Sequence, residues 1–111
     1  MYLGIDLGTS AVKTVLVDDA QRVVASRSHA LTIDVPQPGW AEQDPAAWIA
    51  AVFATLDALK LDHAGELAAV DGIGLSGQMH GPVLLDADMT PLRPCILWND
   101  GRSAGECAVL E

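Results

Sequence analysis

The pattern of apolar and polar positions along the first part of the chain predicts three β-strands. Apolar segments cover residues 2–6, 11–18 and 23–31, the second of them rich in β-branched residues, and only short turns separate them. Because strands joined by short connections pair with their neighbours, we expect an antiparallel meander. The first segment is expected to be a short buried strand that ends at Asp6.

The next apolar pattern has the period of a helix and follows a loop. Residues 34–45 hold three prolines and a glycine without periodicity, which indicates a loop. Asp44 and Pro45 provide an N-cap acceptor and a proline at the first helical position, so a helix is expected from there to about residue 60. Its buried face is expected to contain four residues at helical spacing: Trp48, Val52, Leu56 and Leu59.

The rest of the chain predicts further strands and a second helix. The pattern indicates a strand at residues 69–77, a strand, a turn and the start of another strand at 82–94, and a strand running into a polar loop at 95–102. A helical pattern begins after Asp100 and is unfinished at the last residue, which supports the hypothesis that the chain is a fragment of a longer protein. Together the segments predict an α/β fold with a mixed sheet and flanking helices.

Length, composition and charge narrow the classes of protein. The chain has 111 residues, of which 50% are hydrophobic, so one compact domain with a core is possible. Its net charge of −9 disfavours nucleic acid and anionic membranes, so a phosphate-bearing ligand needs backbone amides, a lysine or a metal ion. No apolar run has the roughly 18 residues of a membrane span. Cys95 and Cys107 lack metal-binding spacing, which favours a reduced, cytoplasmic setting with Cys95 packed as a small apolar residue.

The turn after the first predicted strand carries the first candidate site. Asp6 ends the strand, Gly8, Thr9 and Ser10 form the turn, and Lys13 lies on the following strand. The turn amides and hydroxyls can form an anion-binding nest, and the carboxylate can orient magnesium or its water shell near phosphate. A plain hairpin turn, in which the carboxylate accepts hydrogen bonds from the two hydroxyls, explains the same residues. Both interpretations stay open on the residues alone.

Two later segments suggest contacts to a polar small molecule. Met79 and His80 lie between glycines at the end of a predicted strand, where the first can pack on a carbon skeleton and the second can hydrogen-bond a hydroxyl. Farther on, Trp98 offers an apolar plate and Asp100 a hydroxyl acceptor, a combination suited to a polyol. The structural alternatives are a strand-end loop with a satisfied histidine and an aromatic residue that merely finishes a strand.

Four segments together resemble the FGGY carbohydrate kinases, in the order that the family has them. They are GIDLGTSAVK, GWAEQDPAAW, GLSGQMHG and PCILWNDGR. Within the family the last two resemble the xylulose kinases, because gluconate kinases usually lack the glycine after Met-His and glycerol kinases carry an arginine-containing segment there. The family belongs to the ribonuclease H-like superfamily of hexokinase, actin and the heat-shock ATPases. Ala11 departs from the pattern, since many members have glycine at that position.

The resemblance implies a role for each candidate residue. Asp6 matches the catalytic aspartate that faces magnesium and the phosphates, while the Gly8–Ser10 turn and Lys13 match the ATP phosphate-binding segment. The sugar-binding positions of the family are matched by four residues: Met79, His80, Trp98 and Asp100. The aspartate that acts as general base lies far downstream in the family and outside this chain.

The implied protein is a sugar kinase, and residues 1–111 are expected to be the N-terminal part of its first, sugar-binding domain, with the second domain absent. The resemblance implies that the full-length parent, a cytoplasmic homodimer, transfers the γ-phosphoryl group of ATP to D-xylulose with Mg²⁺. The isolated chain is expected to be inactive. Two alternatives stay open: an FGGY kinase for another sugar such as gluconate or ribulose, and a non-catalytic actin- or chaperone-like nucleotide-binding module. Nucleic acid and membranes are not expected partners.

Overall fold

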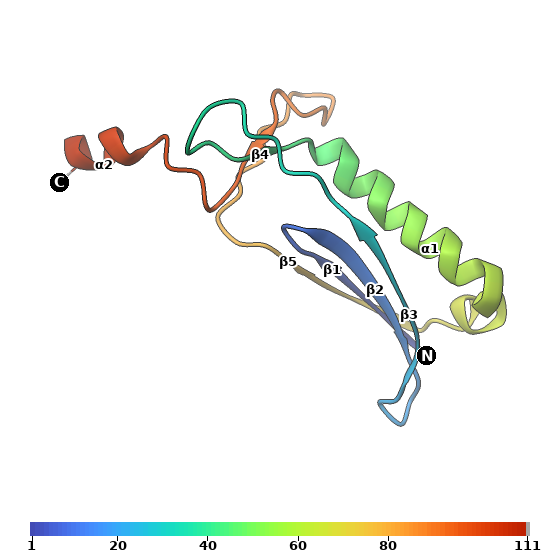
Figure 1. The fold of residues 1–111 in the computed structure, drawn as a ribbon. Helices are drawn as coiled ribbons and strands as arrows, with labels where there is room; N and C mark the ends of the chain where they lie inside the picture. Colours follow the sequence, from blue (N-terminus) through green and yellow to red (C-terminus); the bar gives the residue numbers. More distant parts are fainter. Residues whose placement is uncertain (111) are drawn as a thin grey trace. The chain divides into compact units, whose positions relative to one another are not determined.

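The computed structural model describes residues 1–110 (Figure 1). The chain divides into two units, Met1–Leu31 with Ala46–Gln78, and Thr32–Pro45 with the chain from Met79 on. The helices and strands are β1 (Tyr2–Leu7), β2 (Ala11–Val17), β3 (Val23–Ala30), β4 (Glu42–Gln43), α1 (Pro45–Ala68), β5 (Gly72–Gly77), β6 (Cys95–Ile96) and α2 (Ala104–Leu110). None of the described helices is both long enough and apolar enough to cross a bilayer.

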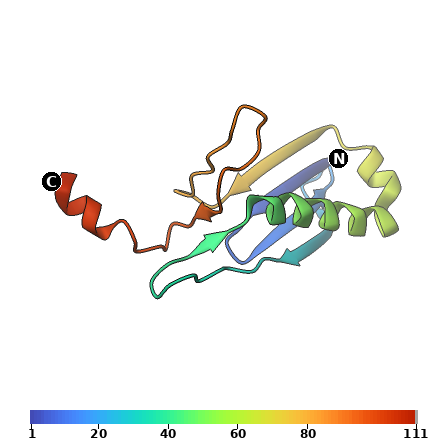
Figure 2. The same cartoon turned by 90° about the horizontal axis from the view of Figure 1, so that it is seen from above.

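The first unit is a four-stranded mixed sheet with the order β3-β2-β1-β5. β1 pairs antiparallel with β2, and β2 with β3, which confirms the predicted meander. The chain then crosses over through α1, and β5 returns parallel to β1. Figure 2 shows α1 lying over the strands of this sheet. Parallel strands need a long crossover connection, and α1 is part of the connection that lets β5 pair with β1 after the antiparallel meander.

The core of this unit lies between one face of the sheet and α1. Its buried members are Leu3, Leu16, Ala25 and Leu59. Because successive side chains of a strand point to opposite faces, the alternate β1 positions Gly4 and Asp6 lie on the other face. The prediction of a buried first strand therefore holds for one face and fails for the other: Leu3 is buried, whereas Tyr2 and Asp6 are exposed.

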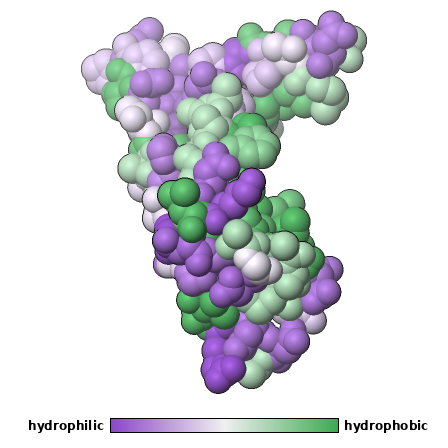
Figure 3. Space-filling view, turned by 90° about the vertical axis from the view of Figure 1, so that its right-hand side faces the viewer, coloured by the Kyte–Doolittle hydropathy of each residue, from purple (hydrophilic) through white to green (hydrophobic). Residues whose placement is uncertain are grey.

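The strand β5 carries apolar side chains that its neighbours do not cover. Ile73 and Leu75 are the register partners of Leu3 and Ile5, and so share their face of the sheet. They nevertheless remain 62% and 80% exposed. Figure 3 shows that apolar and polar residues mix on the face of the molecule that it draws.

The helix α1 begins at Pro45 as predicted but continues to Ala68, beyond the expected end near residue 60. Two helical segments join at His63, whose φ of −133° and ψ of 38° are not helical. Of the four predicted buried residues, Leu59 is fully buried and the other three are partly buried. The most buried line instead runs along Ala51, Thr55 and Leu59, and the Thr55 hydroxyl donates to the carbonyl of Val52 at 2.8 Å.

The second unit contains less regular structure than the sequence predicts. β4 forms inside the predicted loop 34–45 and pairs antiparallel with β6. The strands predicted within 82–94 reduce to a single bridge between Leu85 and Pro91, around a turn in which Asp86 accepts hydrogen bonds from two backbone amides. Prolines 91 and 94 have no amide hydrogen, so this stretch cannot extend a regular ladder. The predicted terminal helix is present as α2.

Candidate functional site

The turn between β1 and β2 is compact and depends on glycine. The Gly8 amide donates to the carbonyl of Ala11 at 3.0 Å, which closes the turn. A Cβ atom added to Gly8 would itself lie 3.0 Å from that carbonyl oxygen. Contacts this short are rarely tolerated against backbone, so glycine allows the close approach that the turn requires.

Neighbouring strands hold the same turn in place. The Thr9 hydroxyl donates to Oε1 of Gln78 at 3.0 Å, and the Gln78 amide donates to the carbonyl of Leu7 at 2.9 Å. On the other side, the Leu31 amide donates to the carbonyl of Ser10 at 2.9 Å. The end of β5 and the end of β3 therefore both fix the turn. Gln78, which the sequence analysis had not linked to the turn, is the residue that ties it to β5.

The sheet face that points away from the core of the first unit carries Asp6, Lys13 and Ser76 side by side. Asp6 is the register partner of Lys13 on β2 and of Ser76 on β5, so all three share the face of the sheet opposite α1. They line an open pocket of about 430 Å³, whose floor includes Gly4 and Gly74. The structure thus brings the predicted carboxylate and lysine together at one end of the sheet.

The Asp6 carboxylate is available to a ligand. Its side chain is exposed, and no hydrogen bond or ion pair within residues 1–110 engages it, so the plain hairpin interpretation loses its expected bonds from Thr9 and Ser10. No group of three or more His, Cys, Asp or Glu side chains in these residues could hold a metal ion by itself. Magnesium is commonly bound by one or two carboxylates together with phosphate oxygens and water. A single unengaged carboxylate beside a glycine turn fits that mode.

The second unit contains a separate pocket of about 320 Å³. It is lined by His80, Pro82, Ile96, Leu97, Trp98, Asp100, Arg102 and Ser103. Three of the four predicted sugar-contacting residues are in this list, and Met79 is not. Met79 is 60% exposed. The pocket joins apolar walls to a few polar groups, the usual composition of a small-molecule site.

Backbone geometry presents His80 at this pocket. His80 has a φ of 58°, in the left-handed region that non-glycine residues seldom adopt. The next residue, Gly81, runs against β6 so closely that an added Cβ would lie 3.1 Å from Sγ of Cys95. Cys95 is fully buried, as predicted, and burial raises the pKa of its thiol. His80 is therefore held on a segment that is packed and locally strained.

Trp98 is displayed by a turn. The Asp100 amide donates to the carbonyl of Leu97 at 3.1 Å, which places Trp98 in the middle of the turn. Leu97 is buried and anchors the turn, whereas Trp98 is 55% exposed. The indole thus forms part of the pocket wall, where an apolar ring can stack against the carbon face of a ligand.

Asp100 is occupied by protein donors. Its carboxylate accepts hydrogen bonds from the Ala41 amide at 2.6 Å and from the amide, Nε and Nη2 of Arg102 at 2.9, 2.9 and 2.7 Å. The hydrogen bonds from the Arg102 side chain hold the pKa of Asp100 well below its usual range. The same bonds raise the pKa of Arg102. Asp100 lines the pocket as an ionised group whose oxygens already have partners.

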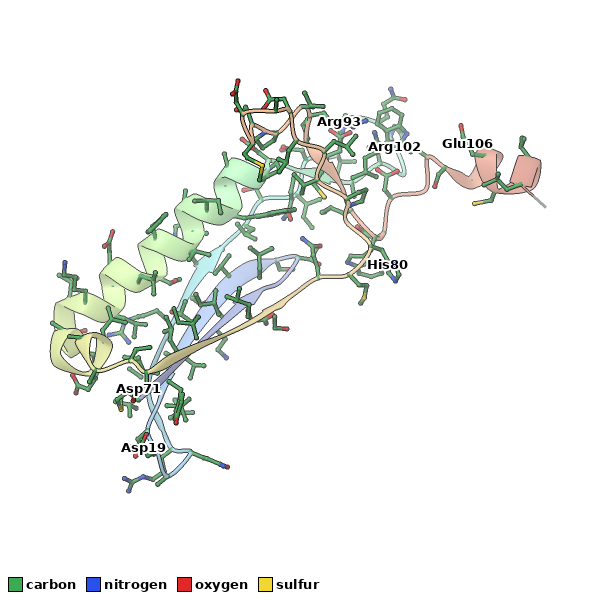
Figure 4. All side chains as sticks on the ribbon, turned by 180° about the vertical axis from the view of Figure 1, so that it is seen from behind. Asp19, Asp71, His80, Arg93, Arg102 and Glu106 are labelled. Carbon is green, nitrogen blue, oxygen red and sulfur yellow. The ribbon has the colours of Figure 1, made fainter. Side chains whose placement is uncertain are left out.

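Glu42 completes this arrangement, and the sequence analysis gave it no role of its own. Oε1 of Glu42 accepts hydrogen bonds from Arg93 Nη2 and from Arg102 Nη1, each at 2.7 Å. The Arg102 guanidinium also stacks over the Trp40 ring, 3.6 Å from its centroid. Figure 4 labels Arg93, Arg102 and His80 with the side chains drawn as sticks. The GWAEQDP segment was the only sequence signal that singled out Glu42 and Trp40.

The predicted site residues fall in both units. Asp6 and the turn residues belong to the first, and Met79, His80, Trp98 and Asp100 to the second. Each group is assembled within its own unit: the first by the β1–β2 turn, and most of the second by the pocket around Trp98.

Comparisons with known proteins place this fold. Residues 1–111 match the N-terminal domain of the FGGY family of carbohydrate kinases. A xylulose kinase of Escherichia coli K12 is 50% identical over the whole chain, and one of Bacillus subtilis is 44% identical over 95% of it. The chain spans only about 22% and 21% of the length of these two relatives.

Solved structures agree with these relatives. A xyloylose kinase from Brucella ovis superposes with a TM-score of 0.95 at 56% identity, covering 98% of this chain and 23% of that one. A gluconate kinase from Lactobacillus acidophilus superposes with a TM-score of 0.83 at 31% identity, covering 98% of this chain and 21% of that one. The likeness confirms the predicted partial α/β kinase domain, with its mixed sheet.

Proposed function

This chain belongs to the FGGY family of carbohydrate kinases, and from that premise we propose that it is the N-terminal part of the sugar-binding domain of a xylulose kinase. The full-length protein would transfer the γ-phosphoryl group of ATP to the 5-hydroxyl of D-xylulose. The proposal carries over the activity for which the xylulose kinase relatives are named. Those proteins are about four to five times as long as this chain.

The observation that carries the proposal is the pocket of the second unit. It combines a histidine, an exposed tryptophan ring and a serine hydroxyl within about 320 Å³, a size typical of small-molecule sites. Trp98 offers a face for the carbon skeleton, and His80 and Ser103 offer hydrogen bonds to hydroxyls. A short neutral ketose has both a carbon face that can stack on the ring and hydroxyl groups that can form these hydrogen bonds.

The turn of the first unit supplies what a phosphate group needs. The Gly8 amide closes the turn by donating to Ala11, so the amides and hydroxyls of Thr9 and Ser10 would be the groups that face phosphate oxygens, and Lys13 would add a positive charge in a chain that is otherwise strongly acidic. Asp6 would hold Mg²⁺, directly or through water, and the ion would neutralise phosphate charge when bound. Positioning and charge stabilisation are the main demands of phosphoryl transfer.

The sugar contacts divide into two kinds. His80 and Trp98 would touch the ketose, whereas Met79, which directly precedes His80, does not line the pocket. Asp100 would act mainly by orienting Arg102, because its oxygens are already occupied by protein donors. No acidic residue of this chain is assigned the role of general base, which would come from the remainder of the protein.

An ADP-release assay on the full-length protein tests the proposal. We expect ADP release that depends on D-xylulose and exceeds that with D-ribulose, D-gluconate or glycerol. Stronger activity with D-gluconate would favour the second candidate, which the 31% identical gluconate kinase structure supports. ADP release without any sugar would refute both and favour a nucleotide-binding module of the actin or chaperone type.

Two further parts of the proposal concern the protein as a whole. The isolated chain is expected to release no ADP, because it would lack the general base. The full-length protein is expected to be a homodimer, and light scattering that gives the mass of one polypeptide would refute this.

A further inference from the structure

The Thr9 hydroxyl, in the turn between β1 and β2, has a single proton, and in the structure that proton goes to a side chain. Thr9 Oγ1 donates to Oε1 of Gln78 at 3.0 Å, within a partly buried contact. A hydroxyl donates one hydrogen bond and can accept others, whereas ionised phosphate oxygens only accept. A phosphate group bound at this turn would therefore compete with Gln78 for the Thr9 proton.

The main chain of Gln78 is fixed by the sheet. Gly77 is the register partner of Leu7 at the end of the β1–β5 ladder, and the Gln78 amide adds a further hydrogen bond by donating to the Leu7 carbonyl at 2.9 Å. The hydrogen bond of the Gly8 amide holds the turn that carries Thr9. The backbone on both sides of the Thr9–Gln78 contact is thus held, so the contact can change mainly through rotation of its side-chain groups.

The amide of a glutamine carries an acceptor and a donor on the two arms of one planar group. A half-turn about the last side-chain bond exchanges them, and Nε2 of Gln78 would then face Thr9 in place of Oε1. In that orientation Gln78 donates to Thr9 Oγ1, and the hydroxyl proton is released towards a neighbouring phosphate oxygen. The contact between the two side chains persists while its direction reverses, so neither side chain loses this partner.

We propose that Gln78 is a positioning residue, which turns its amide so that the Thr9 hydroxyl donates to a phosphate oxygen of the nucleotide. This inference rests on the proposed function, which places phosphate at the turn. Directed neutral donors matter in this chain because its net charge is −9 and each of its arginines is paired with a carboxylate. Gln78 acts through Thr9 and is not a catalytic residue.

Titration calorimetry on the full-length protein tests this orientation, with the β,γ-imido analogue of ATP and Mg²⁺ as the probe. Thr9→Val removes the hydroxyl and keeps the branched shape, so it should weaken binding of the analogue about tenfold, because a hydrogen bond to a charged group is lost. In the Gln78→Glu background the same change should weaken binding by about twofold or less, because there the hydroxyl donates to an ionised carboxylate, which has no proton to return.

The comparison of Thr9→Val in the two backgrounds separates orientation from charge. The repulsion between phosphate and the carboxylate of Gln78→Glu is the same with and without the Thr9 hydroxyl, so it cancels in the double-mutant cycle. Gln37→Glu is the matched control, since it adds the same charge at an exposed position of the second unit and should leave the effect of Thr9→Val intact. Thr9→Ser keeps the hydroxyl and should retain most of the affinity.

If circular dichroism shows that Gln78→Glu does not fold, Gln78→Met is the second background. Methionine has a similar length but cannot donate to Thr9, so the effect of Thr9→Val should fall to about threefold. An effect of about tenfold in every background would overturn the inference, and so would an effect below about twofold in the unaltered protein. Failure of the proposed function alone has a different signature, which is the absence of ketose-dependent ADP release while the analogue still binds. Absence of any binding of the analogue would overturn both.

Discussion

Replacing Leu59 by alanine measures how much of the stability of the first unit comes from the contact of α1 with the sheet. Leu59 is fully buried in the cluster with Leu3, Leu16 and Ala25, so the change removes three buried carbons and leaves a cavity. Substitutions of this type cost roughly 2–5 kcal/mol, and we expect about 3 kcal/mol because the cluster is small and α1 is the helix that covers it in the described part of the chain.

Urea unfolding of the chain, followed by circular dichroism, gives the measurement. With a denaturant slope of about 1.5 kcal/mol per molar, a loss of 3 kcal/mol lowers the midpoint by about 2 M. Leu61→Ala is the matched control, since Leu61 lies on the same helix but is 86% exposed. Its midpoint should move by no more than the equivalent of about 0.5 kcal/mol. Equal shifts for the two variants would refute the assignment of the core to this face of α1.

Three further predictions concern the candidate sites. In the full-length protein, Asp6→Asn should abolish most turnover while calorimetric sugar binding survives; near-normal turnover would disprove the role of the carboxylate. His80→Asn, chosen because asparagine tolerates the φ of 58°, should raise the KM for D-xylulose about tenfold with little change in kcat, and an unchanged KM would argue against contact. Hydrogen bonds from Arg102 lower the pKa of Asp100, so its carboxylate stabilises the fold above about pH 4 and loses this effect as the pH falls through the lowered value. Asp100→Asn should therefore lower the thermal midpoint at pH 7, with a difference from the unaltered chain that narrows towards pH 2; a difference independent of pH would contradict this.

The sequence predicted the parts of the fold that depend on local patterns. Short connections between apolar segments were enough to predict the meander, and Asp44-Pro45 was enough to place the start of α1. Burial of the first strand was mispredicted because an apolar run does not reveal whether one face or two are covered. β4 was missed because two residues among prolines carry no strand signal, although pairing with β6 stabilises them.

The candidate sites, too, contain features that local patterns predict and features that depend on contacts between distant residues. The turn at Gly8–Ser10, the segment around His80 and the segment around Trp98 are each continuous in sequence. Each could therefore be recognised in the sequence by its glycines or its aromatic residue. The link of Glu42 to Arg93 and Arg102 joins residues more than fifty positions apart, and ion pairs at such separations leave no period in a sequence. The unengaged carboxylate of Asp6 likewise became visible only when the register of β1 with β2 and β5 was known.

The contrast between the two cysteines has a practical consequence for chemical labelling. Cys95 is buried against Gly81 with a raised pKa, so little of it is thiolate at neutral pH, whereas Cys107 is exposed on α2. Maleimide reagents react with accessible thiolates. A fluorophore can therefore be attached to α2 of the unaltered chain, giving a spectroscopic reporter on the unit that holds the tryptophan pocket without any cysteine substitution.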